Sequence, residues 1–134
     1  MEKPNILVIM TDEQNLRTIG KYRDLFRQSY PNSTQHTHPW GEGVEVLTEH
    51  IDSLAEDGAI FSNFYTVSPI CTTSRGTFMT GTYPSTNGAK HNHQPMNDDA
   101  VTFAEELQDY GYSTSYMGKV GAMFVGLVHR MFVD

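Results

Sequence analysis

The chain alternates short apolar runs with polar segments, and this pattern predicts three strands. Residues 6–10 form a continuous apolar run that contains β-branched members. Such a run is typical of a strand buried on both faces of a parallel sheet. Residues 59–67 are rich in aromatic and β-branched side chains and predict a second strand, and we expect a third at residues 112–117.

Three helices are predicted between and after these strands. Residues 49–57 place apolar side chains at helical spacing, with Thr48 in position to cap the helix and Gly58 to stop it. A short helix at about residues 74–79 is closed by a glycine, and a Thr-x-x-Glu capping box at residues 102–105 opens a third helix.

The remaining polar stretch, residues 21–43, contains two prolines and two glycines and predicts a long loop. Strands that alternate with helices indicate an α/β protein with a layered, mostly parallel sheet and helices on both of its faces.

Composition narrows the classes of partner. The 134 residues are 38% hydrophobic and carry a net charge of −7, which argues against a nucleic-acid partner. A single cysteine excludes an internal disulfide framework. The apolar run at residues 6–10 is too short for a signal peptide or a membrane span, so we expect no membrane association. As written the chain is expected in the cytoplasm, or in the periplasm or outside the cell if an upstream segment is missing.

Polar side chains that could bind a metal or act in catalysis follow the predicted strands. Asp12 and Glu13 follow the first, Cys71 and Arg75 follow the second, and Lys119 follows the third. Because parallel strands end at one edge of a sheet, these groups are expected to converge there. Adjacent carboxylates suit a hard divalent cation, while the two cations would neutralise the oxygens of a sulfate or phosphate. Taken singly, each has a plainer interpretation: a lone cysteine is usually a small buried hydrophobe, and single charges are usually surface groups.

Two other motifs carry less weight. His36-x-His38 and His91-x-His93 have spacings that can chelate zinc, but they lie in polar loop sequence without an accompanying cysteine or glutamate pattern. A cysteine-dependent phosphatase uses Cys-x5-Arg, whereas only three residues separate Cys71 from its arginine. That class is excluded.

The order of three motifs resembles the N-terminal part of a type I sulfatase, in the alkaline phosphatase superfamily, over residues 4–119. The first strand and Asp12 resemble the family's opening strand and first metal ligand. The nucleophile motif is matched by Cys71, Ser74, Arg75, Phe78, Met79, Thr80 and Gly81. A later motif is matched by Gly111, Tyr112, Thr114, Gly118 and Lys119. The resemblance implies an alkaline-phosphatase-like fold, incomplete here, and residues 1–134 as the N-terminal portion of a catalytic domain.

The resemblance also implies a mechanism. Cys71 would be oxidised to formylglycine by a formylglycine-generating enzyme, and its hydrate would attack the sulfur of a sulfate ester, carried by a small molecule or a sugar. The resulting hemiacetal sulfate would collapse to sulfate and aldehyde. Asp12, Glu13 and the modified Cys71 would bind one divalent metal, Ca²⁺, while Arg75 steadies the hydrate and Lys119 binds a sulfate oxygen.

The chain departs from the family pattern in three places. Thr73 stands where the modification motif has proline. In the family a catalytic histidine follows soon after the lysine, whereas this chain continues after Lys119 with Val120 and has no histidine at that place. Two later metal ligands have no counterpart. From residue 119 onward the chain departs from the family pattern, and we expect a truncation or a frameshift there. Two alternatives therefore stay open: a phosphoester or phosphonate monoester hydrolase of the same superfamily, and a non-catalytic fragment.

Overall fold

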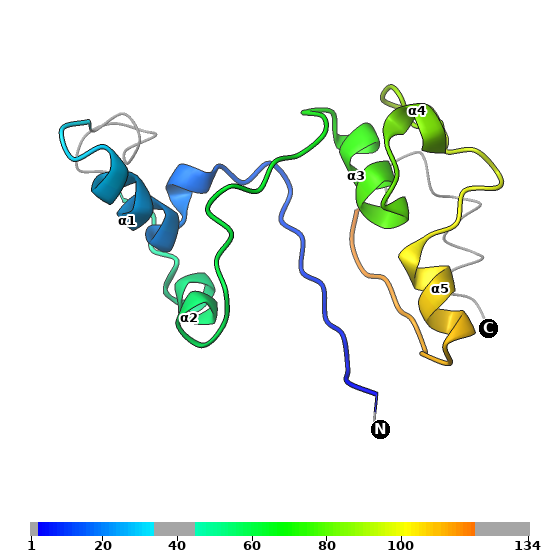
Figure 1. Ribbon diagram of the computed structural model, residues 1–134, viewed down its shortest axis with the longest axis horizontal. Helices are drawn as coiled ribbons and strands as arrows, with labels where there is room; N and C mark the ends of the chain where they lie inside the picture. The colour runs from blue at the N-terminus through cyan, green and yellow to red at the C-terminus, as the bar shows by residue number, and fades with distance from the viewer. Residues whose placement is uncertain (1–2, 34–44, 120–134) are drawn as a thin grey trace. The chain divides into compact units, whose positions relative to one another are not determined.

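The computed structural model describes residues 3–33 and 45–119, and the chain divides into two compact units with the boundary between Phe64 and Tyr65. The positions of the units relative to one another are not determined, so each is described by itself (Figure 1). The helices are η1 (Leu16–Thr18), α1 (Gly20–Ser29), α2 (Glu49–Asp57), α3 (Cys71–Thr80), α4 (Pro84–Asn87) and α5 (Phe103–Asp109). Within the described ranges, no helix is long and apolar enough to cross a membrane.

Helix α1 corrects the prediction of a long loop over residues 21–43, because the chain is helical from Gly20 to Ser29. Its start is held by side chains that are distant in sequence. The Gly20 N–H donates to Thr48 Oγ1 at 2.8 Å, and the Lys21 N–H donates to Asp52 Oδ1 at 2.9 Å. These acceptors satisfy N–H groups that have no partner within the helix. Thr48 is the N-cap residue of α2, as predicted, but its hydroxyl accepts from the start of α1 and makes no capping bond to the backbone of α2.

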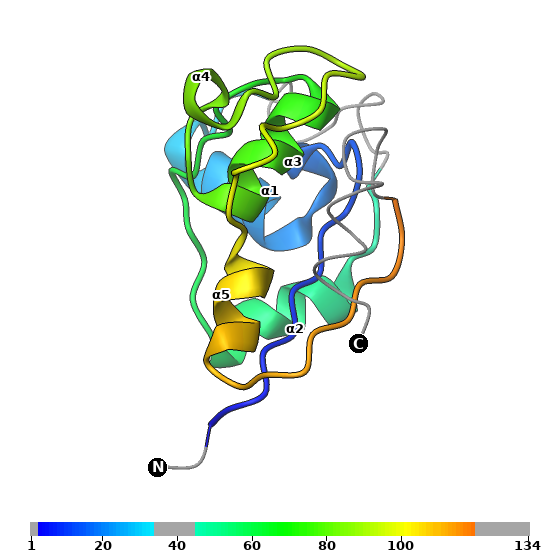
Figure 2. The ribbon, with the colours of Figure 1, turned by 90° about the vertical axis from the view of Figure 1, so that its right-hand side faces the viewer.

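The second unit is built around α3, which lies between α4 and α5 in both Figure 1 and Figure 2. Its buried apolar side chains come from α3, α5 and the loops beside them: Met79, Ala89, Met96 and Ala104. Asn87 is also buried, and its amide donates to Thr80 Oγ1 and to the Thr82 carbonyl. This bond pair ties the end of α4 to the end of α3.

The predicted helices are confirmed. Helix α2 spans the predicted residues 49–57. The capping box of α5 forms as expected, with the Thr102 N–H donating to Glu105 Oε2 at 2.9 Å and the Glu105 N–H donating to Thr102 Oγ1 at 3.3 Å. Helix α3 begins three residues earlier than predicted, at Cys71, and ends at Gly81, whose φ of 66° lies in the left-handed region that glycine adopts without strain.

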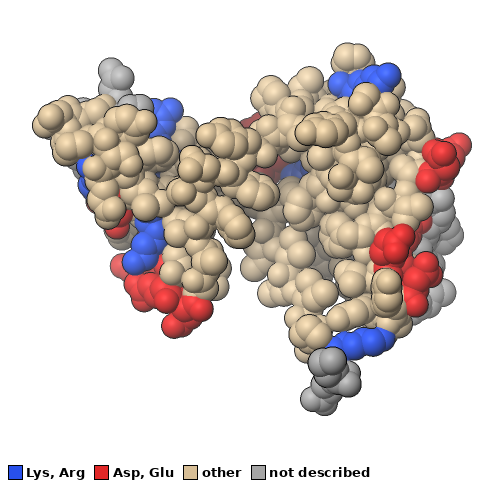
Figure 3. Space-filling model, viewed as in Figure 1, with Lys and Arg blue, Asp and Glu red and all other residues tan. Residues whose placement is uncertain are grey.

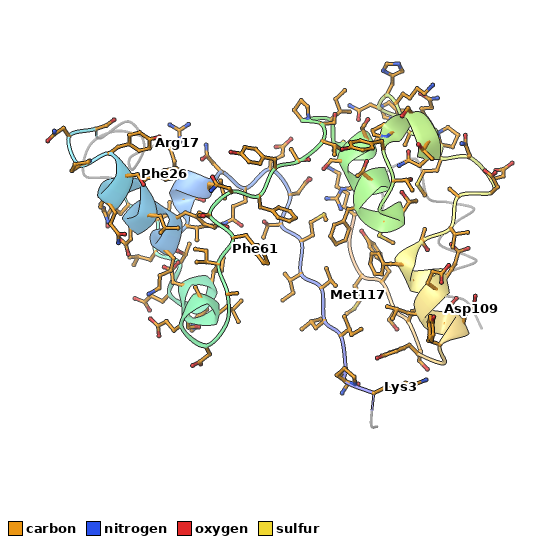
Figure 4. The ribbon with its side chains drawn as sticks, in the orientation of Figure 1. Lys3, Arg17, Phe26, Phe61, Asp109 and Met117 are labelled. Carbon is orange, nitrogen blue, oxygen red and sulfur yellow. The ribbon has the colours of Figure 1, made fainter. Side chains whose placement is uncertain are left out.

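The three predicted strands are not formed in the residues that the structure describes. Residues 6–10, 59–67 and 112–117 run as extended chain and turns. A strand is stable only when its backbone groups pair with a neighbour and its apolar side chains are covered. Here large apolar side chains stay exposed, with Leu7 at 85% and Met117 at 95%. Figure 4 shows Phe61 and Met117 on these extended segments. The layered parallel sheet is therefore not confirmed by the described part of the chain.

Candidate active site

Cys71 is the first residue of α3, and its thiol is free and exposed. The interpretation of the lone cysteine as a buried hydrophobe is therefore wrong. The Cys71 thiol donates to Asn92 Oδ1 at 3.3 Å, and the Thr72 N–H points at the same oxygen at 3.5 Å. Asn92 thus provides a hydrogen-bond acceptor at the first turn of α3, although it lies 21 residues after Cys71 in the sequence. Nothing in the sequence pattern singled it out, because it lies in a polar loop between two histidines.

Hydroxyl groups organise the chain where it enters α3. Ser68 Oγ accepts a hydrogen bond from the Ile70 N–H at 3.1 Å, and the hydroxyls of Thr66 and Ser74 are 2.9 Å apart. The Ser74 N–H donates to the Ile70 carbonyl at 2.9 Å and closes the first turn. These local bonds fix the backbone on both sides of Cys71 and hold its side chain at the surface.

A hydrogen bond joins the nucleophile motif to the Gly-Lys motif. The Arg75 guanidinium donates to the Lys119 carbonyl at 3.2 Å, and the Tyr116 hydroxyl donates to the same oxygen at 2.5 Å. Gly118 has a φ of 119°, which side chains of L-residues rarely tolerate, so the glycine of this motif is required by the backbone that presents Lys119. The prediction that Arg75 and Lys119 lie close together is consistent with this contact.

Thr73, which stands at the proline position of the modification motif, is buried with 3% of its surface exposed. Its hydroxyl has no hydrogen-bond partner among the described residues, and the hydroxyl of Thr77, one turn further along α3, also has none. Burial removes the hydroxyl from water, and without a hydrogen bond in the folded state the free-energy cost of that desolvation is not offset. Thr73 therefore lowers the stability of α3 in the same turn as the predicted modification site.

Asp12 and Glu13 belong to the first unit, so the structure does not place them relative to Cys71. Both are exposed, and Glu13 adopts a φ of 56°. Across residues 3–33 and 45–119, no group of three or more histidine, cysteine, aspartate or glutamate side chains gathers to hold a metal. Ca²⁺ takes six to eight oxygen ligands. The adjacent carboxylates therefore fit part of a calcium site and do not complete one.

The pair formed by His91 and His93 is not part of a larger metal-binding cluster in the described part of the chain. His91 and His93 are exposed in the loop between α4 and α5, and His93 has a φ of 65°. The pair formed by His36 and His38 lies outside the described residues, as does the tail from residue 120 onward.

Comparison with known proteins identifies the class to which this arrangement belongs. The profile of the sulfatase family matches residues 4–129, which is nearly the whole chain. The chain belongs to the sulfatase family, and membership of that family implies an alkaline-phosphatase-like fold.

Individual relatives agree with this assignment. The chain is 33% identical over 119 residues to an uncharacterized sulfatase, YidJ, of Escherichia coli, covering 89% of the chain and 20% of the relative. It is 33% identical over 117 residues to an ulvan-active sulfatase of Formosa agariphila, covering 87% and 19%. It is 35% identical over 124 residues to a choline-sulfatase of Rhizobium meliloti, covering 92% and 20%. The chain thus spans about a fifth of the length of these relatives. No solved structure gives a significant match.

Proposed function

We propose that this chain supplies the nucleophile and part of the sulfate-binding site of a sulfatase, which hydrolyses a sulfate ester to an alcohol and inorganic sulfate. The observation that carries the proposal is the hydrogen bond from Arg75 to the Lys119 carbonyl, which joins the two family motifs within one unit. An exposed Cys71 lies one helical turn before that arginine, on the same face of α3.

The nucleophile in this proposal is formylglycine, made from Cys71 by a formylglycine-generating enzyme, and its hydrate supplies the hydroxyl that attacks sulfur. Asn92 Oδ1 is within hydrogen-bond reach of the Cys71 side chain and would accept a hydrogen bond from a hydroxyl at this position. Arg75 and Lys119 provide positive charge for the sulfate oxygens as the alcohol leaves.

A divalent cation, Ca²⁺, completes the proposed site. Asp12 and Glu13 would supply two of its oxygen ligands and the modified Cys71 a third, with further ligands outside the part of the chain that is described. The substrate class is a sulfate ester of a small molecule or a sugar, as the names of sulfatase relatives suggest for those proteins.

A chimera tests the proposal without requiring the short chain to act alone. The matching fifth of the Rhizobium meliloti choline-sulfatase is replaced by residues 4–119 of this chain and co-expressed with a formylglycine-generating enzyme. Intact-mass analysis reports whether Cys71 has become an aldehyde. Activity is measured as the inorganic sulfate released from a sulfate ester that the unaltered choline-sulfatase hydrolyses. We expect turnover above that of a Cys71→Ala chimera.

Matched variants sharpen the result. Arg75→Lys keeps the charge but loses the planar fork, so we expect a rate reduced by at least about tenfold. A parallel assay with the corresponding phosphate ester separates the phosphoesterase alternative. A folded, aldehyde-bearing chimera that releases no sulfate, or one that prefers the phosphate ester, would contradict the proposal. Activity of the isolated chain above its own Cys71→Ala control would contradict the fragment alternative.

A further inference from the structure

The second unit contains a groove that the proposed active site does not use. It has a volume of about 570 Å³ and is lined by the last turn of α3 and the residues just after it, by α4, by the first turn of α5 and by the segment before α5. This volume is within the range of small-molecule sites in proteins. Helix α3 has ten residues, so its C-terminal end lies about 14 Å along the helix axis from Cys71. The groove is therefore separate from the nucleophile.

Aromatic and aliphatic side chains line one part of the groove. Phe78 of α3 and Phe103 of α5 form an edge-to-face pair with ring centroids 5.7 Å apart. Phe78, Phe103 and Val101 remain exposed at 44%, 37% and 54% although they line the same groove. Their surfaces are available to an apolar body, and the aromatic faces also attract cations.

Negative charge lines the other part. The carboxylates of Asp99 and Glu106 both border the groove, and neither forms an ion pair within the described ranges. Residues 91–118 contain five acidic residues and no lysine or arginine. Figure 3 shows acidic side chains along the edge of the unit that α5 and the preceding segment form. The last turn of α3 carries no basic residue, so no cationic side chain of that turn offsets the negative end of its dipole beside the groove.

We propose that this groove binds a small organic cation: an amidinium, guanidinium or alkylammonium group carried on an apolar body. The apolar body would pack against Phe78, Val101 and Phe103. The cationic group would lie between the carboxylates of Asp99 and Glu106, near the C-terminal end of α3. A neutral ligand of the same shape gains only the apolar contact, and an anion is repelled. The inference is independent of the proposed sulfatase function.

The test uses the 134-residue chain and a pair of probes that differ in charge. Benzamidinium and the neutral isostere benzamide are titrated at low salt, with backbone amide chemical shifts as the readout. We expect benzamidinium to bind at least tenfold more tightly than benzamide, with shift changes centred on residues 78–82 and 99–106. We also expect its affinity to fall as NaCl is raised.

Charge variants locate the site. Asp99→Asn combined with Glu106→Gln should weaken benzamidinium binding about tenfold. The matched control is Asp109→Asn, which removes a charge at the C-terminal end of α5, away from the groove lining (Figure 4), and it should change affinity less than twofold. Equal binding of the two probes, shift changes centred elsewhere, or an equal loss in the control variant would overturn the proposal. The comparison of probes needs no variant, so it stands even if the double variant is poorly folded.

Discussion

Replacing Thr73 with valine should stabilise α3. The side chain is 3% exposed, and its hydroxyl has no partner among the described residues. Valine has nearly the same shape and a similar helix propensity, so the substitution removes mainly the unsatisfied hydroxyl. A buried polar group without a partner costs about 1–3 kcal/mol. We therefore expect the free energy of opening of α3 to rise by about 1.5 kcal/mol.

Thr80 provides the matched control on the same helix, because its hydroxyl is fully used. It donates to the Gly76 carbonyl at 2.8 Å, lies 2.8 Å from Thr82 Oγ1 and accepts from the Asn87 amide at 3.2 Å. Thr80→Val removes these bonds and leaves buried partners unsatisfied. We expect it to destabilise α3 by about 1–3 kcal/mol.

Native-state amide hydrogen exchange measures both effects, since it reports local opening without requiring a global two-state transition. A stabilisation of about 1.5 kcal/mol slows exchange in α3 roughly tenfold, and Thr80→Val should speed it by a similar factor. If the Thr73→Val chain exchanges as fast as the parent or faster, the hydroxyl has a partner, such as a buried water, and the reasoning fails.

Three further results are expected. Thr102→Ala removes the capping box and should destabilise α5 by about 1 kcal/mol, measured as faster amide exchange in that helix; unchanged exchange would show that the box contributes nothing. Asn92→Asp places a carboxylate against the Cys71 thiol, disfavours the thiolate and should slow alkylation by iodoacetamide several-fold at pH 8, whereas faster alkylation would contradict the contact. Thr73→Pro restores the proline of the modification motif in the first turn of α3, where proline is tolerated. It should raise the fraction of chains that mass analysis shows to carry the aldehyde after co-expression with the modifying enzyme, and an unchanged fraction would refute this.

The parts of the fold that local chemistry specifies were predicted from sequence. Helix α2 follows from its spacing of apolar residues, and α5 follows from the reciprocal Thr102–Glu105 cap. Gly81 marked the end of α3 because helices commonly end at a residue in the left-handed conformation, which glycine adopts without strain.

The parts that depend on distant residues were not predictable in this way. Helix α1 begins where side chains from around α2 satisfy its first N–H groups, and no local signal announces them. Asn92 contacts Cys71 for the same non-local reason. The apolar runs at residues 6–10 and 59–67 were assigned as strands from composition, but pairing decides whether a strand forms, and composition does not encode the partner. Whether Asp12 and Glu13 join Cys71 stays a prediction.

The hydrogen bond between the two sulfatase motifs has a consequence for how the site can be dissected. Arg75 contacts the main chain of Lys119, and the acceptor is a carbonyl that every residue type carries. A change of side chain at position 119 therefore alters the local charge while the contact that positions Arg75 is retained. The contribution of the Lys119 charge can therefore be measured separately from that of Arg75 by mutation. A Lys119→Met variant would report the role of the ammonium group alone, whereas truncation of the Arg75 side chain removes its charge and its contact with the main chain together.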